Sequence, residues 1–291
     1  TTTTTTVPGP TPGTVLRFEY GPDDAPTEYY AYLPKGHDGV TPLPLIIGLH
    51  GYTQPPSATL GAFPLSLLDE RGYAWLAPSA TDKEGRNRQW AFITTEEQSV
   101  SQWPENPPGG GQYHPYGDED VERIVDVLDD FAARVPIDTD RIYAWGFSGG
   151  AWMSVRLACD LSNVFVAVAA GTSGVFFPEG CAPSRSIPII SFGTTEDPYH
   201  PADWTRDGAH LWAEYQGCDV PETATVQSNE FLVQEIRYGN CRDDAEIVVV
   251  LIEGAIPGIW FNSESPWAGD LAPPYDDPPA LLLEFFESHT G

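Results

Sequence analysis

Positive charge is scarce in this sequence. Lys35 and Lys83 are its only lysines, and 14 basic residues stand against 42 acidic ones, which gives a formal net charge of −28. A surface of this sign repels nucleic acids and anionic membranes, so we exclude both as partners. One explanation is adaptation to a salty medium, where salt screens the repulsion between like charges. The acidic surface affects solubility, and it does not indicate a substrate.

Long apolar runs and metal-binding cysteine patterns are also missing. No segment has the roughly 18 consecutive apolar residues that a membrane-spanning helix needs. The cysteines form neither a CxxC pair nor a Cys/His cluster, so we expect no metal site. Four cysteines allow three disulfide pairings, and four buried free thiols are the alternative. They are Cys159, Cys181, Cys218 and Cys241.

A stretch rich in threonine, proline and glycine opens the chain, since residues 1–14 read TTTTTTVPGPTPGT. It cannot bury apolar surface, and we interpret it as a flexible stalk left after processing of a secreted or lipid-anchored precursor. From residue 15 to 291 no break in composition marks a second domain, and 41% of the chain is hydrophobic. We expect one domain, monomeric and either secreted or extracytoplasmic.

Past residue 14, strand patterns alternate with helix patterns. This alternation predicts an α/β fold with a mostly parallel central sheet and helices on both faces. Residues 81–117 form a long polar and aromatic excursion, and long loops often carry function. The expected strands are Val15–Tyr20 paired with Glu28–Leu33, then Leu43–Leu49, Tyr73–Leu76, Arg141–Phe147, Phe165–Ala170, Ile187–Phe192 and Glu246–Ile252. The expected helices are 58–70, Asp118–Val135, Ala151–Cys159, 203–216 and Pro279–Ser288.

Residues 146–150, Gly-Phe-Ser-Gly-Gly, match the GxSxG pattern of a nucleophile elbow. They lie where a buried strand ending near Trp145 turns directly into a helix starting near Ala151. The turn is so sharp that side chains flanking the serine would collide with the neighbouring strand and helix, which explains the glycines. We predict that Ser148 is a nucleophile at the carboxyl edge of the sheet. The alternative is a structural Gly/Ser turn.

The sequence HGYTQ, residues 50–54, follows the apolar strand LPLIIGL. An HG turn at this place supplies the second donor of an oxyanion hole, so we assign the hole to the backbone N–H groups of Tyr52 and Gly149. His50 is then expected to hold the loop by hydrogen bonds rather than act as a base.

A carboxylate follows the strand IPIISF, in the sequence GTTEDP. Its position after the serine fits the chain order serine, acid, histidine. Glu196 and Asp197 are both candidates for the acid that orients the base.

Three runs carry a resemblance to a known family: HGYTQ, DEDVERIVDVLDDFAARVPIDTDRIYAWGFSGGAWMSVRLACD and CAPSRSIPIISFGTTEDP. From about residue 15 onward the chain resembles the secreted poly(3-hydroxybutyrate) depolymerase and feruloyl esterase family. The resemblance implies an α/β-hydrolase fold and an esterase without metal or organic cofactor. Its implied substrates are hydroxycinnamoyl or acetyl esters of plant cell walls, or aliphatic polyesters. It further implies Asp197 as the acid, and the disulfides Cys159–Cys181 and Cys218–Cys241.

The chain departs from the family at the catalytic histidine. Family members carry it just after the last strand, in a stretch like GGGHTWPG, whereas residues 253–260 here read EGAIPGIW. Without a base the serine hydroxyl is a poor nucleophile. His200, three residues past Asp197 on the same loop, is our candidate replacement, and His114 in the long excursion is the alternative. The other histidines lie on an expected turn (His37), in an expected helix (His210) and at the chain end, where we expect a surface position (His289).

Tryptophans flank the motif loops. Trp90, Trp152 and Trp204, with Trp103, are candidates for a platform under an aryl or polymeric ester, and the alternative is that each belongs to the core or a loop. We therefore expect a serine esterase that acts through an acyl-enzyme on feruloyl- or acetyl-type plant esters or on polyesters. The second hypothesis is an esterase fold without a base that binds a polymer or glycan. A third is acyl transfer to an alcohol.

Overall fold

The structure is a computed structural model. It describes residues 9–21, 27–61, 63–81, 88–92, 117–171, 175, 176, 178, 180–197, 200–228, 231–254 and 277–291. Everything below concerns these ranges. Residues 255–260, in the stretch where the family carries its histidine, and the candidates His114 and Trp103 lie outside the described residues.

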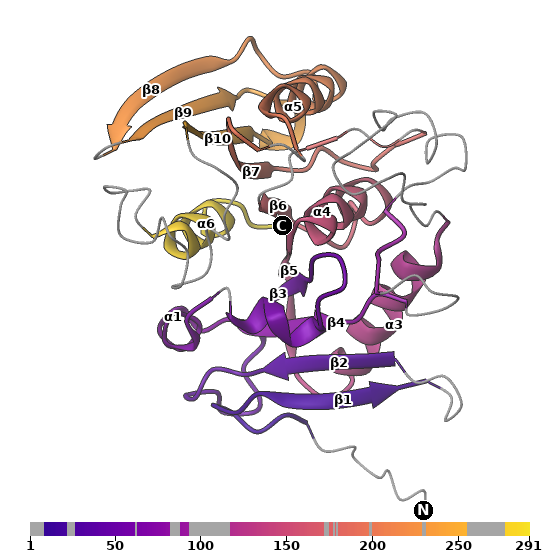
Figure 1. The fold of residues 1–291 in the computed structure, drawn as a ribbon. Helices are drawn as coiled ribbons and strands as arrows, with labels where there is room; N and C mark the ends of the chain where they lie inside the picture. Colours follow the sequence, from indigo (N-terminus) through magenta and orange to yellow (C-terminus); the bar gives the residue numbers. More distant parts are fainter. Residues whose placement is uncertain are drawn as a thin grey trace, which may run out of the picture.

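One ten-stranded sheet runs through the described residues, in the order β1-β2-β4-β3-β5-β6-β7-β10-β9-β8 (Figure 1). The strands from β4 across to β10 run parallel, and the outer pairs β1–β2 and β9–β8 are antiparallel. The mostly parallel sheet predicted from the sequence is confirmed. The strands are β1 Leu16–Tyr20, β2 Thr27–Tyr32, β3 Leu43–Leu49, β4 Ala74–Pro78, β5 Ile137–Phe147, β6 Ala167–Gly171, β7 Ile189–Thr194, β8 Glu222–Ser228, β9 Phe231–Tyr238 and β10 Ile247–Glu253.

Helices cover both faces of the sheet, as predicted (Figure 1). On β3, Leu45 and Ile47 belong to one core and Ile46 to the other, as the two-residue period of a strand requires. The first core also contains the apolar sides of α3 (Glu119–Ala132), α4 (Gly149–Asp160) and α5 (Ala202–Gln216). The second contains residues of α1 (Leu65–Arg71) and α6 (Pro278–Glu287), and two short 3-10 turns, η1 (Pro56–Gly61) and η2 (Arg242–Asp244), complete the elements.

Two elements differ from the prediction. The expected helix 58–70 is split into η1 and α1, because Pro64 stands directly before α1 and a proline disfavours helix in the residue preceding it. The hairpin β8–β9 was not predicted. β8 is exposed along nearly its whole length, so its sequence ETATVQS shows none of the apolar alternation by which strands are recognised.

The sheet brings the ends of its parallel strands to one edge. Leu49 of β3 pairs with Gly146 of β5, and Phe147 pairs with Gly171 of β6. Ile252 of β10 pairs with Thr194 of β7. The residues that follow these strands therefore meet at the carboxyl edge, where ligands bind in open α/β sheets.

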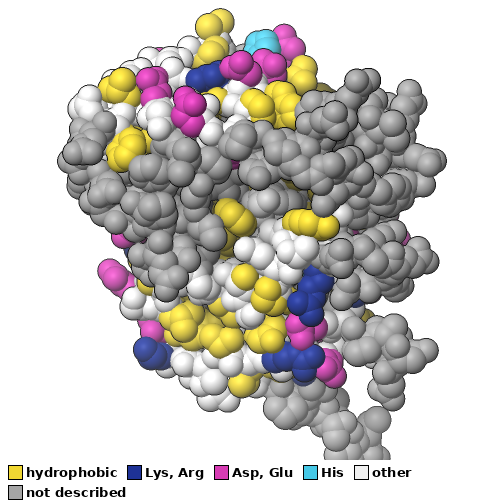
Figure 2. All heavy atoms as spheres, in the orientation of Figure 1, with side chains coloured by type: hydrophobic (Ala, Val, Ile, Leu, Met, Phe, Trp, Pro, Cys, Tyr) yellow, Lys and Arg dark blue, Asp and Glu magenta, His cyan; other side chains and the backbone are white. Residues whose placement is uncertain are grey.

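Acidic side chains are prominent on the surface. Figure 2 shows several of them grouped near the end of the sheet that carries β8, β9 and α5, with few basic side chains among them. On α5 the exposed residues include Asp203, Asp207 and Glu214. Among the described residues, no helix has the length and apolar character that crossing a membrane requires.

Candidate active site

Ser148 lies between the end of β5 and the start of α4, in a strained backbone conformation. Its φ of 52° and ψ of −122° fall in a region that residues other than glycine rarely occupy. Its backbone N–H donates to the carbonyl of Gly171 on β6 at 3.1 Å, and its carbonyl accepts from the amide of Ala151 at 2.9 Å. Strand and helix together therefore hold the serine in this turn, and its side chain is partly exposed.

The flanking glycines are sterically required. A Cβ at Gly146 would lie 1.9 Å from the carbonyl oxygen of Gly150, and a Cβ at Gly150 would lie 2.0 Å from the carbonyl oxygen of Leu49. Both obstacles are backbone atoms, which cannot move aside as a side-chain tip can. β5, α4 and the end of β3 approach so closely that only glycine fits at these two positions.

The loop after β3 reaches the N-terminus of α4. The Cβ position of Gly149 lies 3.8 Å from the backbone nitrogen of Tyr52, so the amides of these two residues are neighbours. The first N–H groups of a helix have no partner within the helix and carry partial positive charge. The turn itself is closed by Gln54, whose side-chain oxygen accepts from the Gly51 amide at 3.0 Å. The arrangement can stabilise a negatively charged oxygen beside Ser148.

His50 is fully buried, and both of its ring nitrogens have protein partners. Nδ1 lies 2.8 Å from the carbonyl of Gly51, and Nε2 accepts from the amide of Ala80 at 3.0 Å. These contacts assign the ring proton to Nδ1, and burial lowers the pKa of His50 to about 4. His50 therefore supports the loop and has no lone pair left for catalysis.

Trp90 belongs to the same support. Its indole N–H donates to the carbonyl of His50 at 2.8 Å, and the side chain is 1% exposed. A ring buried under the loop cannot offer a face to a substrate. The structure thus contradicts our expectation that Trp90 forms part of a substrate platform.

Asp197 follows β7 and is nearly buried, whereas the neighbouring Glu196 is exposed. The Asp197 carboxylate accepts a hydrogen bond from the backbone N–H of His200 at 3.0 Å, and its second oxygen lies 3.4 Å from the ring Nδ1 of His200. The loop is tied to the end of β10, since Thr195 Oγ1 accepts from the amide of Gly254 at 2.9 Å. An acid and a histidine therefore pair at the carboxyl edge.

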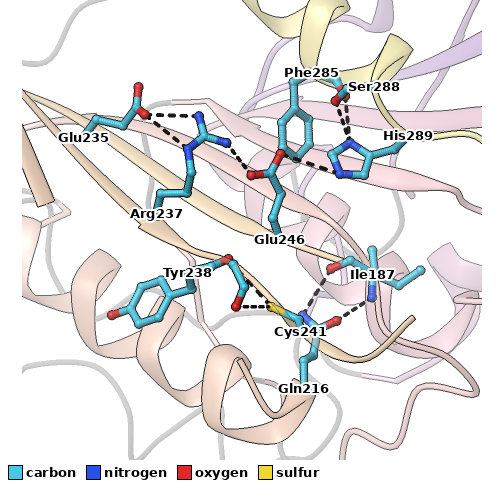
Figure 3. A network of polar contacts seen from close by, with 11 residues as sticks. Ile187, Gln216, Glu235, Arg237, Tyr238, Cys241, Glu246, Phe285, Ser288 and His289 are labelled. Carbon is cyan, nitrogen blue, oxygen red and sulfur yellow. Dashed lines mark hydrogen bonds and ion pairs between the residues drawn. The ribbon is translucent and has the colours of Figure 1, made fainter. Parts of the chain in front are cut away.

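Three further histidines that the structure describes, His289, His210 and His37, lie toward the amino ends of the parallel strands. His289 was expected at the surface, but its side chain is only 12% exposed, and Figure 3 shows its ring between Ser288, Phe285 and Glu246. Its Nδ1 lies 2.8 Å from the Phe285 carbonyl and its Nε2 lies 3.6 Å from a Glu246 carboxylate oxygen. Glu246 directly precedes β10, whose seven residues span about 20 Å. His289 is thus at the opposite edge of the sheet from Ser148.

The remaining two candidates are equally unsuitable. His210 lies on α5, as predicted, with its ring toward Tyr238, which pairs with Ile247 at the amino end of β10. His37 follows β2 at the end where Tyr32 pairs with Trp75, near the amino end of β4. Of the described histidines, His200 alone combines the carboxyl edge with a carboxylate partner.

Two buried charged residues fix the segments beside the site, and the sequence analysis missed both. Asp120 on α3 accepts from the amides of Thr81 and Ala91. Arg156 on α4 donates to the carbonyls of Ala91 and Gly117, and it forms ion pairs with Asp118 and Asp160. The available signal was a charged residue among the apolar positions of a helix, since buried charges require partners.

The two predicted disulfides are present. Cys159 at the end of α4 is bonded to Cys181, with a Cα–Cα distance of 5.5 Å. Cys218 after α5 is bonded to Cys241, with a Cα–Cα distance of 3.9 Å. The pairing implied by the family resemblance is therefore confirmed, and no free cysteine is found.

The sequence also matches a family of known proteins. The family model described as esterase PHB depolymerase matches residues 27–210, more than half of the chain. The chain belongs to this esterase family. Membership makes it a carboxylic ester hydrolase and confirms the resemblance read from the sequence. The matched region contains Tyr52, Ser148, Asp197 and His200, and it ends before β8.

Individual relatives agree with the family. The probable feruloyl esterase C of Aspergillus terreus is 26% identical over 246 residues, which cover 84% of this chain and 81% of that protein. Feruloyl esterase B of Piromyces equi is 32% identical over 155 residues, 47% of this chain but 28% of that protein. Among solved structures, acetyl xylan esterase from Aspergillus awamori has a TM-score of 0.63, over 94% of this chain and 99% of that one. At 15% identity this likeness concerns the α/β-hydrolase fold alone.

Proposed function

We propose that the protein is a secreted serine carboxylic-ester hydrolase, with Ser148 as nucleophile, His200 as base and Asp197 as the acid that orients the base. The observation that carries the proposal is the strained backbone of Ser148 between β5 and α4, beside the Tyr52 amide. Such strain persists only where the surrounding structure imposes it, and it concentrates at functional sites. In this proposal His200 takes the role of the histidine that residues 254–276 do not contain.

In the first half-reaction His200 Nε2 takes the Ser148 hydroxyl proton as Oγ attacks the acyl carbon. The resulting tetrahedral oxyanion rests on the backbone N–H groups of Tyr52 and Gly149. The intermediate collapses to the acyl-enzyme, and the imidazolium gives its proton to the departing alcohol. Water, deprotonated by His200, then attacks the acyl-enzyme, and the imidazolium returns the proton to Ser148 Oγ as the acyl–oxygen bond breaks and the carboxylic acid leaves. Asp197, bound to the Nδ1–H, keeps the lone pair of the neutral ring on Nε2 and stabilises the imidazolium when it forms.

The substrates that we propose are feruloyl- or acetyl-type esters of plant polymers, or polyesters. Support comes from the names of the relatives, two feruloyl esterases, and from the family description as PHB depolymerase. Methyl ferulate, acetylated xylan and poly(3-hydroxybutyrate) separate these classes. The substrate class with the highest kcat/KM identifies the natural ester type.

A secreted location fits the two disulfides, because such bonds persist in oxidising compartments. It also fits the acidic composition, which keeps a protein soluble outside the cell. Expression with oxidation of the thiols should be required for stable protein, whereas full activity of a fully reduced preparation would argue against this location.

Hydrolysis of p-nitrophenyl acetate and butyrate tests the mechanism. We expect turnover by the wild type, none above background for Ser148→Ala, and a loss of about 10³-fold or more for His200→Ala. His210→Ala, on the exposed side of α5, is the matched control and should retain wild-type activity. A wild-type rate equal to that of Ser148→Ala would instead favour a protein that binds an ester-bearing polymer without cleaving it. An unchanged rate in His200→Ala removes His200 from the mechanism.

A further inference from the structure

We propose that Trp152 is the positioning residue of His200, and that its indole ring holds the imidazole at the angle from which the base serves Ser148. The proposal rests on the proposed function, because that function makes His200 the base. Trp152 lies in the first turn of α4, and its backbone amide donates to the carbonyl of Ser148 at 3.3 Å. The ring centroids of Trp152 and His200 are 5.0 Å apart, with the planes at 78°. The ring that contacts the proposed base therefore lies in the helical turn that directly follows Ser148.

Trp152 is itself held firmly. Its side chain is 8% exposed, and on a second side it packs against Phe92 at a centroid distance of 4.8 Å. The backbone before Phe92 is fixed by two buried charges, because the Ala91 amide donates to Asp120 and the Ala91 carbonyl accepts from Arg156. A shift of Trp152 toward Phe92 would therefore disturb the hydrogen bonds that Asp120 and Arg156 form with Ala91. Its burial also argues against the exposed platform for substrate that the sequence suggested.

His200 needs such a contact because of where it lies. Acid and histidine are three residues apart on one loop, and the ring Nδ1 is 3.4 Å from the Asp197 oxygen. A contact of this length fixes the ring only loosely, since normal N–H···O distances are about 2.9 Å. A hydrogen bond to one ring nitrogen does not by itself fix the plane of an imidazole. A perpendicular indole ring restricts that rotation, and aromatic pairs prefer this geometry.

The Trp152 ring can also stabilise the positive charge that forms on His200. His200 becomes an imidazolium in the transition state for attack by Ser148, and an aromatic ring within about 6 Å of a cation can stabilise it. Removing the ring should therefore lower kcat rather than weaken binding of a small ester. Misplacement of a catalytic group by about 1 Å can cost about 10²-fold in rate.

The kinetic experiment compares three substitutions, with p-nitrophenyl acetate as the substrate. For Trp152→Leu we expect kcat to fall about 10- to 100-fold with KM changed less than about twofold. Trp152→Phe retains a ring and should recover most of kcat. Phe176→Leu is the matched control, because Phe176 belongs to the same cluster but contacts Phe92. If Trp152→Leu does not fold, Trp152→Met replaces it, since methionine fills more of the space.

A second measurement does not depend on turnover. In protein labelled with 15N-histidine, the His200 ring signals are identified by their loss in His200→Gln. We expect narrow signals of one neutral tautomer in the wild type and in Trp152→Phe. In Trp152→Leu they should broaden or average between tautomers.

The outcomes separate this proposal from the proposed function. An unchanged kcat in Trp152→Leu, or His200 signals as narrow and in the same tautomer as in the wild type, overturns the positioning role. Equal loss of kcat in Trp152→Phe and Trp152→Leu also contradicts it, because any aromatic ring should serve in part. If the wild type is no more active than Ser148→Ala, the proposed function fails, and the ring signals alone decide whether Trp152 orders His200.

Discussion

The carboxylate of Asp197 binds His200 twice, once through the backbone amide and once at the ring. The proposed orienting acid and the proposed base therefore share a single loop after β7. The loop is anchored to the end of β10, where the Thr195 amide donates to the carbonyl of Ile252 at 3.0 Å. The end of β10 therefore helps to position the loop that carries His200.

Asp197 and Glu196 offer a test of this arrangement within one loop. Asp197→Asn should lower kcat for p-nitrophenyl acetate about 10³-fold, because an amide cannot fix the ring tautomer that leaves Nε2 basic. Glu196→Gln removes the adjacent, exposed carboxylate and should stay within about twofold of the wild type. Steady-state kinetics of both variants checks this. Equal losses in the two variants would point to the net charge of the loop rather than to a specific pair.

The backbone contact at Gly150 predicts a loss of stability. In Gly150→Ala the new methyl group would meet the Leu49 carbonyl at 2.0 Å, and overpacking of this kind costs about 3 kcal/mol or more when backbone must move. Gly36→Ala is the control, since no atom lies within 4 Å of its Cβ position. Urea unfolding measures both. A Gly150→Ala protein as stable as the wild type would mean that β3 and α4 are not so close.

Sequence patterns predicted the helices and strands whose apolar residues follow a regular pattern. Buried parallel strands such as LPLIIGL and EIVVVLI are continuous apolar runs, and α3 has a clear apolar side. The elbow at Ser148 could be placed because its glycines have a local steric cause. The hairpin β8–β9 could not be predicted, because an exposed edge strand has no buried side to mark it.

Long-range contacts could not be predicted from local patterns. That His200 pairs with Asp197 was a hypothesis from spacing alone, and that Trp152 contacts His200 depends on how α4 and the loop after β7 pack. His289 was assigned to the surface from its place near the chain end. Its partial burial follows from the docking of the C-terminal residues, where Tyr143 donates to the His289 carbonyl at 2.8 Å.

We expect that replacing the buried Arg156 lowers the free energy of unfolding strongly. Arg156→Met would leave the carbonyls of Ala91 and Gly117 and the carboxylate of Asp160 without their donor, and breaking a buried ion pair typically costs about 3–5 kcal/mol. Arg156→Lys should not restore stability, because an ammonium group cannot replace the planar fork of donors. Urea unfolding should show both losses.

Arg206→Met is the control for Arg156, since Arg206 pairs with the exposed Asp203 on the surface of α5. Surface ion pairs contribute about 0–1 kcal/mol. If Arg206→Met and Arg156→Met lose the same free energy of unfolding, the buried contacts of Arg156 contribute no more stability than a surface ion pair.

His50 predicts a specific dependence of stability on pH. Burial lowers its pKa in the folded protein from 6.5 to about 4, so between these values the unfolded chain binds the proton and the folded protein does not. Stability is therefore fully present above about pH 6.5 and falls as the pH drops toward 4, by up to about 3 kcal/mol. In His50→Gln, the difference in unfolding free energy between pH 7.5 and pH 4.5 should be about 2 kcal/mol smaller than in the wild type. His210→Gln, whose side chain is 59% exposed, should keep the wild-type difference. The same pH difference in all three proteins would show that His50 is protonated as readily in the folded state as in the unfolded chain.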